Sequence, residues 1–427
     1  MPVDPDPANT PPCHDVLIVG GGLVGASLAI ALDRLGLDVG LIEAAPPGSL
    51  PAVFDERNLS FAEATVNALT ALGVMQKLHA PTGAIRRIHI SRCGDFGRAV
   101  LEAHDHGREA FGQVVIARDF GDALEARLAE LPKLMRYRPV RFVGLESGLA
   151  DAASINGYRA VRVSDDAGER VLHTRLLVAA DGTRSQVRDA LGIESDSHDY
   201  GQTLFVSRLR TERAPDGTAY ERLGEHGPTA LLPRGDRHFG LVHGVASSEA
   251  EAVAALDEPD FLQRVQEVFG WRVGRFLSCG RPSTYPAIRT VARRLTAPRA
   301  VLVGNAAQTV HPVGAQGFNL GLRDALTLAE LIEAARTTDP AADCGAAELL
   351  AAHVERRQVD REQTLAFSHG LARLTANDLP WLGPLRSLGL FALDRLPSAQ
   401  AAIVGGALGY RGHVPTLCRA GAERSMT

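Results

Sequence analysis

Several features are missing from this 427-residue sequence, and each absence excludes a class of protein. No run approaches the roughly 18 consecutive apolar residues of a membrane-spanning helix. The 45 basic and 50 acidic residues are mixed along the chain, so nucleic acid is not an expected partner. The amino-terminal stretch MPVDPDPANTPPCHD lacks the apolar core of a signal peptide. We therefore expect residues 1–14 to form a disordered lead.

Cysteine is also scarce, with five residues that are far apart and include no Cys-x-x-Cys pair. This pattern argues against a disulfide framework and against a zinc site. The sequence therefore predicts a cytoplasmic protein without a metal site.

A glycine-rich loop, IVGGGLVGASLA, is the first motif that is present. The spacing predicts a strand over 15–20, a helix over 23–35 and a second strand over 38–43, with Gly20, Gly22 and Gly25 in the pattern G-x-G-x-x-G. The start of the helix, at Leu23 and Val24, offers backbone N–H groups to phosphates. Glu43 ends the second strand, where it can accept both ribose hydroxyls of the adenosine of FAD or NAD. The alternative is that the glycines serve packing alone.

Two later motifs each follow a buried strand. In LLVAADGTRSQVR (176–188) the strand ends at Asp181 and Gly182, a turn as typical of structure as of function. In VLVGNAAQTVHPVGAQGFNLG (301–321) Gly304 and Asn305 end a strand before a helix expected over about 316–336. The positive end of that helix suits a planar ring with a negative edge, and Asn305 suits a polyol chain. Packing is again the alternative for both motifs.

In this order the three motifs resemble the class A flavoprotein monooxygenases, the family of para-hydroxybenzoate hydroxylase, over about residues 15–410. The resemblance implies that the first loop binds the ADP part of FAD and that Asp181-Gly182 lies near FAD and the nicotinamide cofactor. It implies that the third motif binds the ribityl chain and the flavin ring. Matches to FDERNLSF and GQVVIARDF add Arg57, Gln113 and Arg118. The complete set of implied cofactor-binding residues is Gly20, Gly22, Leu23, Val24, Gly25, Glu43, Arg57, Gln113, Arg118, Asp181, Gly182, Gly304, Asn305, Pro312, Gly314, Ala315, Gln316, Gly317, Phe318 and Asn319.

Within the family, the sequence is similar to the ubiquinone-biosynthesis branch and most of all to 2-polyprenyl-6-methoxyphenol hydroxylases. The segment GNAAQTVHPVGAQGFNLGLRDALTLAEL has the Asn-Ala-Ala-Gln of that branch, and EHGPTALLP, FGWRVG and STYP fit it too. One departure is Ala315, which stands where the branch has a glycine. The methyl group of Ala315 puts the position or mobility of the flavin ring in question.

The resemblance implies an FAD-dependent monooxygenase that hydroxylates a polyprenylated phenol, with NAD(P)H and O2 as co-substrates and a flavin C4a-hydroperoxide as oxygen donor. A flavin-binding scaffold subunit, a hydroxylase of another aromatic compound and a polyprenyl reductase are the alternatives. No catalytic residue is assigned. The candidates for a proton relay are Tyr220, His238, His243 and Tyr285, each of which also suits a structural role.

The implied substrate tail is very apolar, and residues 379–410 are rich in leucine and poor in charge. We expect this region to contact a membrane surface or other proteins of ubiquinone biosynthesis, so that the protein is cytoplasmic and peripheral on the inner membrane. A helix packed on the core is the alternative.

The overall fold class predicted is α/β with α+β insertions. It consists of a Rossmann-like FAD-binding domain (15–80, 98–197 and 296–345), an antiparallel-sheet substrate domain (81–97 and 198–295) and a helical carboxyl-terminal region (346–427). Within the first domain, Ser60 and Glu63 have the spacing of a capping box, which predicts that a helix starts after Ser60.

Overall fold

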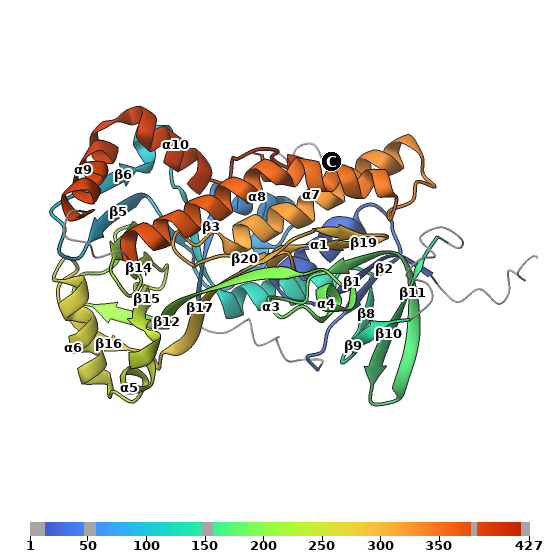
Figure 1. Cartoon of the computed structure of the whole chain (residues 1–427), viewed down its shortest axis with the longest axis horizontal. Helices are drawn as coiled ribbons and strands as arrows, with labels where there is room; N and C mark the ends of the chain where they lie inside the picture. The colour runs from blue at the N-terminus through green and yellow to red at the C-terminus, as the bar shows by residue number, and fades with distance from the viewer. Residues whose placement is uncertain (1–12, 47–56, 147–156, 377–381, 420–427) are drawn as a thin grey trace, which may run out of the picture.

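The computed structural model describes residues 13–46, 57–146, 157–376 and 382–419. Twelve residues of the expected amino-terminal lead, 1–12, lie outside this part, and the first strand already begins at Cys13. Figure 1 shows an elongated molecule with a large sheet and its helices toward one end and a second sheet toward the other.

The first sheet has a parallel centre. Its strand order is β18-β19-β11-β1-β2-β8, and β1 (Cys13–Val19) runs parallel to both β2 (Val39–Ile42) and β11 (Gly168–Ala179). The outer strands of this order are β8 (Met135–Tyr137), β19 (Ala300–Leu302) and β18 (Thr296–Ala297). Strands β9 (Arg141–Leu145) and β10 (Arg159–Asp165) extend β11 in antiparallel fashion. The apolar run Val16–Val19 is buried, as expected for a central parallel strand.

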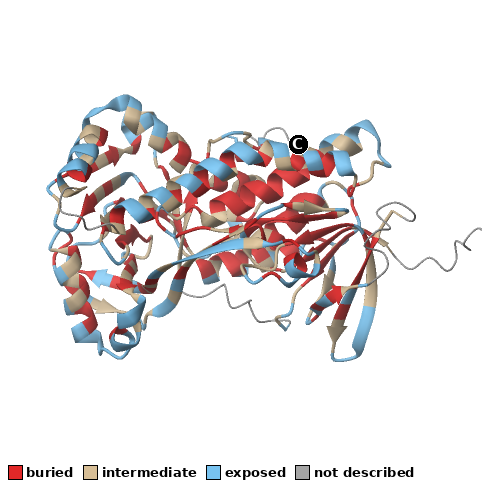
Figure 2. Cartoon of the chain, in the orientation of Figure 1, coloured by how far each residue is buried: buried red, intermediate tan, exposed pale blue. Residues whose placement is uncertain are grey.

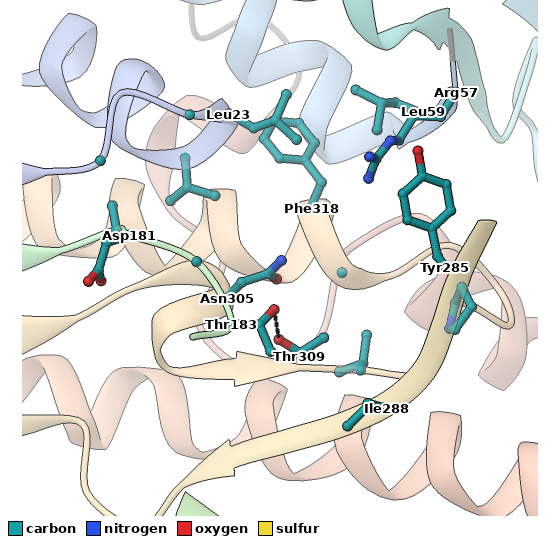
Figure 3. A pocket seen from close by; sticks show the side chains of 18 of the residues that line it. Leu23, Arg57, Leu59, Asp181, Thr183, Tyr285, Ile288, Asn305, Thr309 and Phe318 are labelled. Atoms are coloured by element: carbon teal, nitrogen blue, oxygen red, sulfur yellow. Dashed lines mark hydrogen bonds between the residues drawn. The ribbon is translucent and has the colours of Figure 1, made fainter. Parts of the chain in front are cut away.

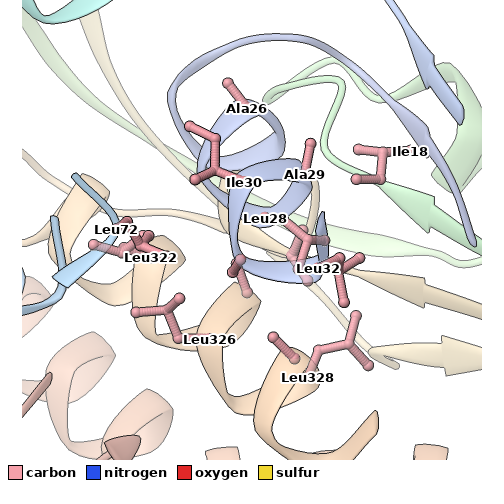
Figure 4. Close-up of a cluster of buried hydrophobic side chains, with 14 of the residues drawn as sticks. Ile18, Ala26, Leu28, Ala29, Ile30, Leu32, Leu72, Leu322, Leu326 and Leu328 are labelled. Atoms are coloured by element: carbon pink, nitrogen blue, oxygen red, sulfur yellow. The ribbon is translucent and has the colours of Figure 1, made fainter. Parts of the chain in front are cut away.

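Helices cover this sheet and bury its apolar side chains. Helix α1 (Leu23–Asp33) packs on α3 (Ala117–Leu128) and on α7 (Gly317–Thr338), which in turn packs on α8 (Ala347–Ala376). Leu28 of α1 and Leu322 and Leu326 of α7 share one core with Ile18 of the sheet (Figure 4). Helix α7 is buried along most of its length (Figure 2). Because β1 and β2 are parallel neighbours joined by α1, residues 15–43 form the predicted βαβ unit.

The second sheet has the order β20-β17-β12-β15-β14-β13-β5-β6, with β16 on the side of β12. Its strands are β5 (Arg87–Arg92), β6 (Arg98–Glu102), β12 (Ser195–Thr211), β13 (Thr218–Leu223), β14 (Thr229–Pro233), β15 (Phe239–Ala246), β16 (Phe276–Cys279), β17 (Ser283–Ala292) and β20 (Gln308–Thr309). Helices α5 (Ala250–Ala254) and α6 (Glu258–Phe269) lie at this end of the molecule (Figure 1). Phe261 and Phe269 of α6 pack on one face of the sheet with Phe205 and Phe239.

Shorter elements join the two sheets. Strands β3 (Asn58–Ala62), β4 (Gly83–Ala84) and β7 (Gly112–Ile116) form a three-stranded sheet beside α2 (Glu63–Ala71). The predicted capping box is wrong, because Ser60 lies inside β3 and Ala62 precedes the helix without a side-chain cap. Because residues 58–62 pair with β7, the chain stays extended through Ser60 and the helix begins only at Glu63.

The remaining helices are α4 (Gln186–Ala190), α9 (Leu382–Arg395) and α10 (Pro397–Ala407). Among the described helices, none is both long and apolar enough to cross a bilayer. The α/β fold class with antiparallel additions and carboxyl-terminal helices is confirmed. The division into three domains stays a prediction, and β6, which falls in the range expected for the first domain, pairs in the second sheet.

Candidate cofactor and substrate site

A cavity of about 1210 Å³ lies where the first sheet, the second sheet and the start of α7 meet. Its wall combines the first glycine loop, the Asp181 turn, the loop from Asn305 to Phe318 and the inner face of the second sheet (Figure 3). Pockets for a single drug-sized ligand measure about 300–1,000 Å³. The cavity therefore has room for a large cofactor together with a second molecule.

The glycine loop at one end of the cavity requires its glycines. Gly20 has φ +107°, and a Cβ atom there would lie 2.5 Å from the carbonyl oxygen of Ala180. A Cβ atom on Gly25 would lie 1.9 Å from the carbonyl oxygen of Gly20. Gly22 precedes α1 without any side-chain cap, and there is no acidic residue in the first turn. The amino terminus of α1 can therefore receive an anion, such as a pyrophosphate.

Glu43 lies beside this loop, on the cavity wall. Its Oε2 atom accepts a hydrogen bond from the backbone N–H of Gly21 at 2.8 Å, and its Oε1 atom accepts one from Ala45 at 2.7 Å. Each carboxylate oxygen keeps further lone-pair capacity. Glu43 is thus held on the cavity wall with acceptor capacity to spare, and its contact with a ribose stays a prediction.

The Asp181 turn is held by its own carboxylate. Asp181 accepts hydrogen bonds from the Ser185 hydroxyl at 2.5 Å and from the backbone N–H of Val187 at 3.1 Å. Burial raises the pKa of Asp181, and these hydrogen bonds offset part of the rise. The neighbouring Thr183 bonds through its hydroxyl to that of Thr309, at 2.7 Å, and so ties this turn to the third motif (Figure 3).

The third motif meets the first at a close contact. Gly304 has φ +60°, and a Cβ atom there would lie 2.9 Å from a methyl group of Val24. The side chain of Asn305 is exposed on the cavity wall beside Thr183 and near Phe318 (Figure 3). Pro312, Ala315, Gly317 and Phe318 line the cavity at the amino terminus of α7. All three predicted motifs therefore converge on one cavity.

Two predicted residues on the cavity wall, Arg57 and Ala315, have unusual geometry. Arg57 lies on the cavity wall with its guanidinium 4.3 Å from the centre of the Tyr285 ring, a cation–π contact. Ala315 adopts a left-handed backbone conformation with φ +50°, which suits glycine better than alanine.

Seven of the implied residues are not on the cavity wall: Gly25, Gln113, Arg118, Gly304, Gly314, Gln316 and Asn319. Gln113 accepts a hydrogen bond from Thr82, and Arg118 is exposed at the start of α3. Gln316 donates to the carbonyl oxygen of Gly314. Asn319 binds the backbone of neighbouring segments. These side chains support or surround the wall, and their contact with a cofactor stays a prediction.

A buried ion cluster beneath the third motif was not foreseen from the sequence. Asp324 of α7 accepts from Gln308 at 2.6 Å and from Arg357 of α8 at 2.7 Å. Arg357 also donates to Asp360, which pairs with Arg323 at 2.6 Å. The spacing of Arg357 and Asp360 along one helix indicates an ion pair between them. Their partners on α7 cannot be identified without the tertiary fold. The cluster fixes α7 and α8 behind the loop that carries Asn305.

Of the four proton-relay candidates, only Tyr285 lies on the cavity wall. Tyr220 packs against Phe239 and Phe269 on the opposite face of the second sheet. His243 is buried, bonds to the Thr229 hydroxyl at 2.9 Å, and has a pKa lowered to about 4 by burial. The wall instead contains Glu221, the residue next to Tyr220, which the sequence did not suggest as a proton relay.

The features of the cavity point to one class of ligand. A βαβ unit with an open helix amino terminus, an acceptor carboxylate at Glu43 and a second loop at the start of α7 fit a flavin–adenine dinucleotide that extends along the cavity. The family described as FAD binding domain matches residues 14–366, and this chain belongs to that family.

Characterised relatives match over nearly the full length. The chain is 34% identical over 386 residues to the ubiquinone hydroxylase UbiL of Rhodospirillum rubrum, covering 90% of this chain and 86% of that protein. It is 30% identical to the ubiquinone hydroxylase UbiM of Neisseria meningitidis, covering 91% and 83%. It is 27% identical to the 3-demethoxyubiquinol 3-hydroxylase of Escherichia coli, covering 89% and 95%.

Solved structures share the fold. The p-nitrophenol 4-monooxygenase PnpA of Pseudomonas putida superposes with a TM-score of 0.72 at 16% identity, covering 95% of this chain and all of that one. PqsL of Pseudomonas aeruginosa, in complex with 2-aminobenzoylacetate, gives a TM-score of 0.70 at 20% identity, covering 89% and 100%. The chain is an FAD-dependent monooxygenase that uses NAD(P)H as co-substrate.

Proposed function

We propose that this enzyme hydroxylates a polyprenylated phenol in ubiquinone biosynthesis. The observation that carries the proposal is the continuity of one cavity from the dinucleotide loop to an apolar wall on the second sheet. That wall includes Leu204, Val206, Leu232, Val242 and Ile288. Such a surface suits an isoprenoid tail, and the named relatives are two ubiquinone hydroxylases and a 3-demethoxyubiquinol 3-hydroxylase.

In this proposal the side chains position the reactants and exclude water. FAD, when bound, would supply the redox chemistry for a hydroxylation that uses NAD(P)H and O2. The amino terminus of α1 would hold its pyrophosphate, Glu43 its ribose and Asn305 its ribityl chain. The positive end of α7 would favour negative charge at the edge of the flavin ring. The apolar wall keeps water from the reacting centre.

A turnover assay on the purified flavoprotein tests the proposed function. NAD(P)H oxidation is followed with and without a phenol that carries a short prenyl tail, and the products are identified by mass spectrometry. Hydroxylated phenol formed in step with stimulated oxidation supports the proposal. A scaffold subunit would bind FAD without this response, and a polyprenyl reductase would return a saturated tail with no added oxygen. Stimulated oxidation without hydroxylated product would contradict the proposal.

We also propose that α9 meets a membrane surface, where a polyprenylated substrate resides. Leu385, Leu388 and Phe391 of α9 and Leu396 just beyond it are 51–57% exposed. Phe96, in the turn between β5 and β6, is 77% exposed, and the adjacent Gly97 lies against Ser387 of α9. Arg386, on the inner side of the helix, bonds to Asp95 at 3.0 Å. The helix is therefore fixed with its apolar side chains outward.

Vesicle binding tests this part of the proposal. Replacing Leu385 and Leu388 together by glutamate should abolish co-sedimentation with anionic phospholipid vesicles without loss of bound FAD. Leu277→Glu is the matched control, because Leu277 is 45% exposed on β16, in a different part of the second sheet. Equal binding of the double variant and the wild type would show that α9 is not the contact surface.

A further inference from the structure

One carboxyl group interrupts the apolar wall of the second sheet. Glu221 of β13 is paired with Ile90 of β5 and with Ala230 of β14. Directly paired residues project on the same face of a sheet. Ala230 is paired in turn with Val242, and Val242 with Val206. Glu221, Ala230, Val242 and Val206 all line the cavity, so the carboxyl group belongs to the apolar face that the substrate would contact.

The carboxyl group is poorly satisfied by the protein. Its Oε2 atom is buried and has no hydrogen-bond partner, whereas the backbone N–H of Gly314 interacts with the carboxyl group. Leaving a buried acceptor unpaired destabilises a protein, and more so when the group is charged. A position that keeps such an atom on a cavity wall is suited to a ligand that brings its own hydrogen-bond donor.

The contact with Gly314 also locates the carboxyl group along the cavity. Gly314 immediately precedes Ala315, which lines the wall at the start of α7. Glu221 therefore lies at the junction between the end of the cavity suited to the flavin ring and the apolar face suited to the substrate. This junction is where a hydroxylated ring has to sit.

Burial raises the pKa of Glu221 to about 7, and the N–H of Gly314 offsets part of the rise. Its paired neighbours Ile90 and Ala230 carry no charge. The other titratable groups on the cavity wall are Glu43, Arg57, Arg141, Asp181 and Tyr285. Glu43 and Asp181 belong to the dinucleotide end, and Arg57 stacks on Tyr285. A base works best when its pKa is near the working pH.

We propose that Glu221 is the catalytic base that takes the proton of the substrate phenol, a role that rests on the proposed phenol hydroxylation. The phenol O–H bond breaks, its electron pair stays on the phenolic oxygen, and the proton passes to Oε2 of Glu221. The phenolate is a better nucleophile at its ring carbons than the neutral phenol. Once the ring carbon has gained its hydroxyl group, the hydrogen that it carried leaves as a proton to the second oxygen atom of O2, which departs as water. The proton on Glu221 returns to the phenolic oxygen and the carboxylate is restored.

The test compares wild type, Glu221→Gln and the matched control Glu225→Gln, each saturated with FAD. Glutamine keeps the shape of the side chain but cannot take a proton, and Glu225 is an exposed carboxylate four residues farther along the chain. Hydroxylation of a short-tailed prenyl phenol is measured against pH, together with the flavin content. We expect wild-type kcat to rise with pH around 7, and Glu221→Gln to lose at least tenfold in kcat and this pH dependence. Glu225→Gln should behave as the wild type.

An acidic phenol, such as a nitro-substituted one that is already ionised at the assay pH, separates a base from a merely structural residue. Because it needs no base, it should be turned over by Glu221→Gln at close to the wild-type rate. A Glu221→Gln enzyme with bound FAD and the wild-type kcat and pH profile for the short-tailed prenyl phenol would overturn this role alone. So would an equal loss of activity with both phenols. A wild type that hydroxylates neither phenol would overturn the proposed function as well, and the two failures are thus distinct.

Discussion

The side chain of Asn319 holds Ala315 in its left-handed backbone conformation: Nδ2 donates to the carbonyl oxygen of Ala315 at 2.9 Å. The same amide group donates to the carbonyl oxygen of Ser60 at 3.0 Å. Its Oδ1 atom accepts from the backbone N–H of Ala62 and from the hydroxyl of Thr65. Asn319 thus connects the loop at the start of α7 with β3 and α2, and fixes the loop that would face a flavin ring.

The conformation of Ala315 gives the first prediction. A non-glycine residue at this φ costs about 1 kcal/mol, so Ala315→Gly should leave the free energy of unfolding unchanged or raise it by up to about 1 kcal/mol. Removing the methyl group from the cavity wall should also tighten FAD binding severalfold. Ala334→Gly, at an exposed position of α7, is the control and should lose about 1 kcal/mol. Denaturant unfolding and flavin titration check both effects, and a loss of stability equal to that of the control would contradict the assigned strain.

Gly317 gives a prediction about charge at the helix start. A Cβ atom there would meet only a methyl group of Val310, at 3.7 Å, so a side chain can be built without displacing the backbone. Gly317→Asp should fold, because a carboxylate stabilises a helix amino terminus. It should nevertheless bind FAD at least tenfold more weakly than Gly317→Asn, which has the same shape without the charge. Equal dissociation constants for the two variants, measured by flavin fluorescence, would place the electron-rich edge of the ring elsewhere.

Glu43 gives a prediction about the adenosine end. Glu43→Gln keeps the size of the side chain but replaces one acceptor oxygen by a donor, so one ribose hydroxyl loses its charged partner. A hydrogen bond to a charged group contributes about 1.5–3 kcal/mol, which corresponds to roughly a tenfold or greater loss of FAD affinity. Glu169→Gln, at the exposed start of β11, serves as control and should bind FAD as the wild type does. Isothermal titration of the apoprotein measures both, and an unchanged affinity of Glu43→Gln would exclude the ribose contact.

The raised pKa of Glu221 predicts how stability depends on pH. Between its ordinary pKa of 4.5 and its folded value of about 7, the folded protein keeps a proton that the unfolded chain has released. The free energy of unfolding should therefore fall as pH rises through this window, by at most about 3 kcal/mol, and then level off. In Glu221→Gln this contribution is absent. Thermal unfolding of both proteins at pH 5 and pH 8 checks the difference, and parallel changes in wild type and variant would contradict it.

The sequence predicted the parts of the site that depend on local geometry. The glycines at positions 20, 22 and 25, the strand that ends at Glu43 and the long helix after Gly317 follow from spacing along one βαβ unit or one loop. Glu221 could not be found this way, because an alternating strand does not reveal which of its faces borders a cavity. The sequence suggested its neighbour Tyr220 as a proton relay, but the side chain of Tyr220 points into the core on the other face of the second sheet.

The buried cluster of Arg323, Asp324, Arg357 and Asp360 could not be predicted either, because it depends on contacts between two helices. Each residue lies in a segment predicted to be helical, but charged residues on a helix are expected to face solvent. Their burial follows from the packing of α7 on α8, which pairs residues more than 30 positions apart. The alanine at position 315, in contrast, could be recognised in the sequence as a replacement of a glycine. Its positive φ explains why glycine suits this position better.

Following the oxygen atom tests the proposed hydroxylation most sharply. The purified, FAD-loaded enzyme is given NAD(P)H, a short-tailed prenyl phenol and isotopically labelled dioxygen, and the phenol is analysed by mass spectrometry. We expect a product that has gained one labelled oxygen atom on the ring for each NAD(P)H consumed in productive turnover. Product without label, or NAD(P)H consumed with the phenol recovered unchanged, would contradict it.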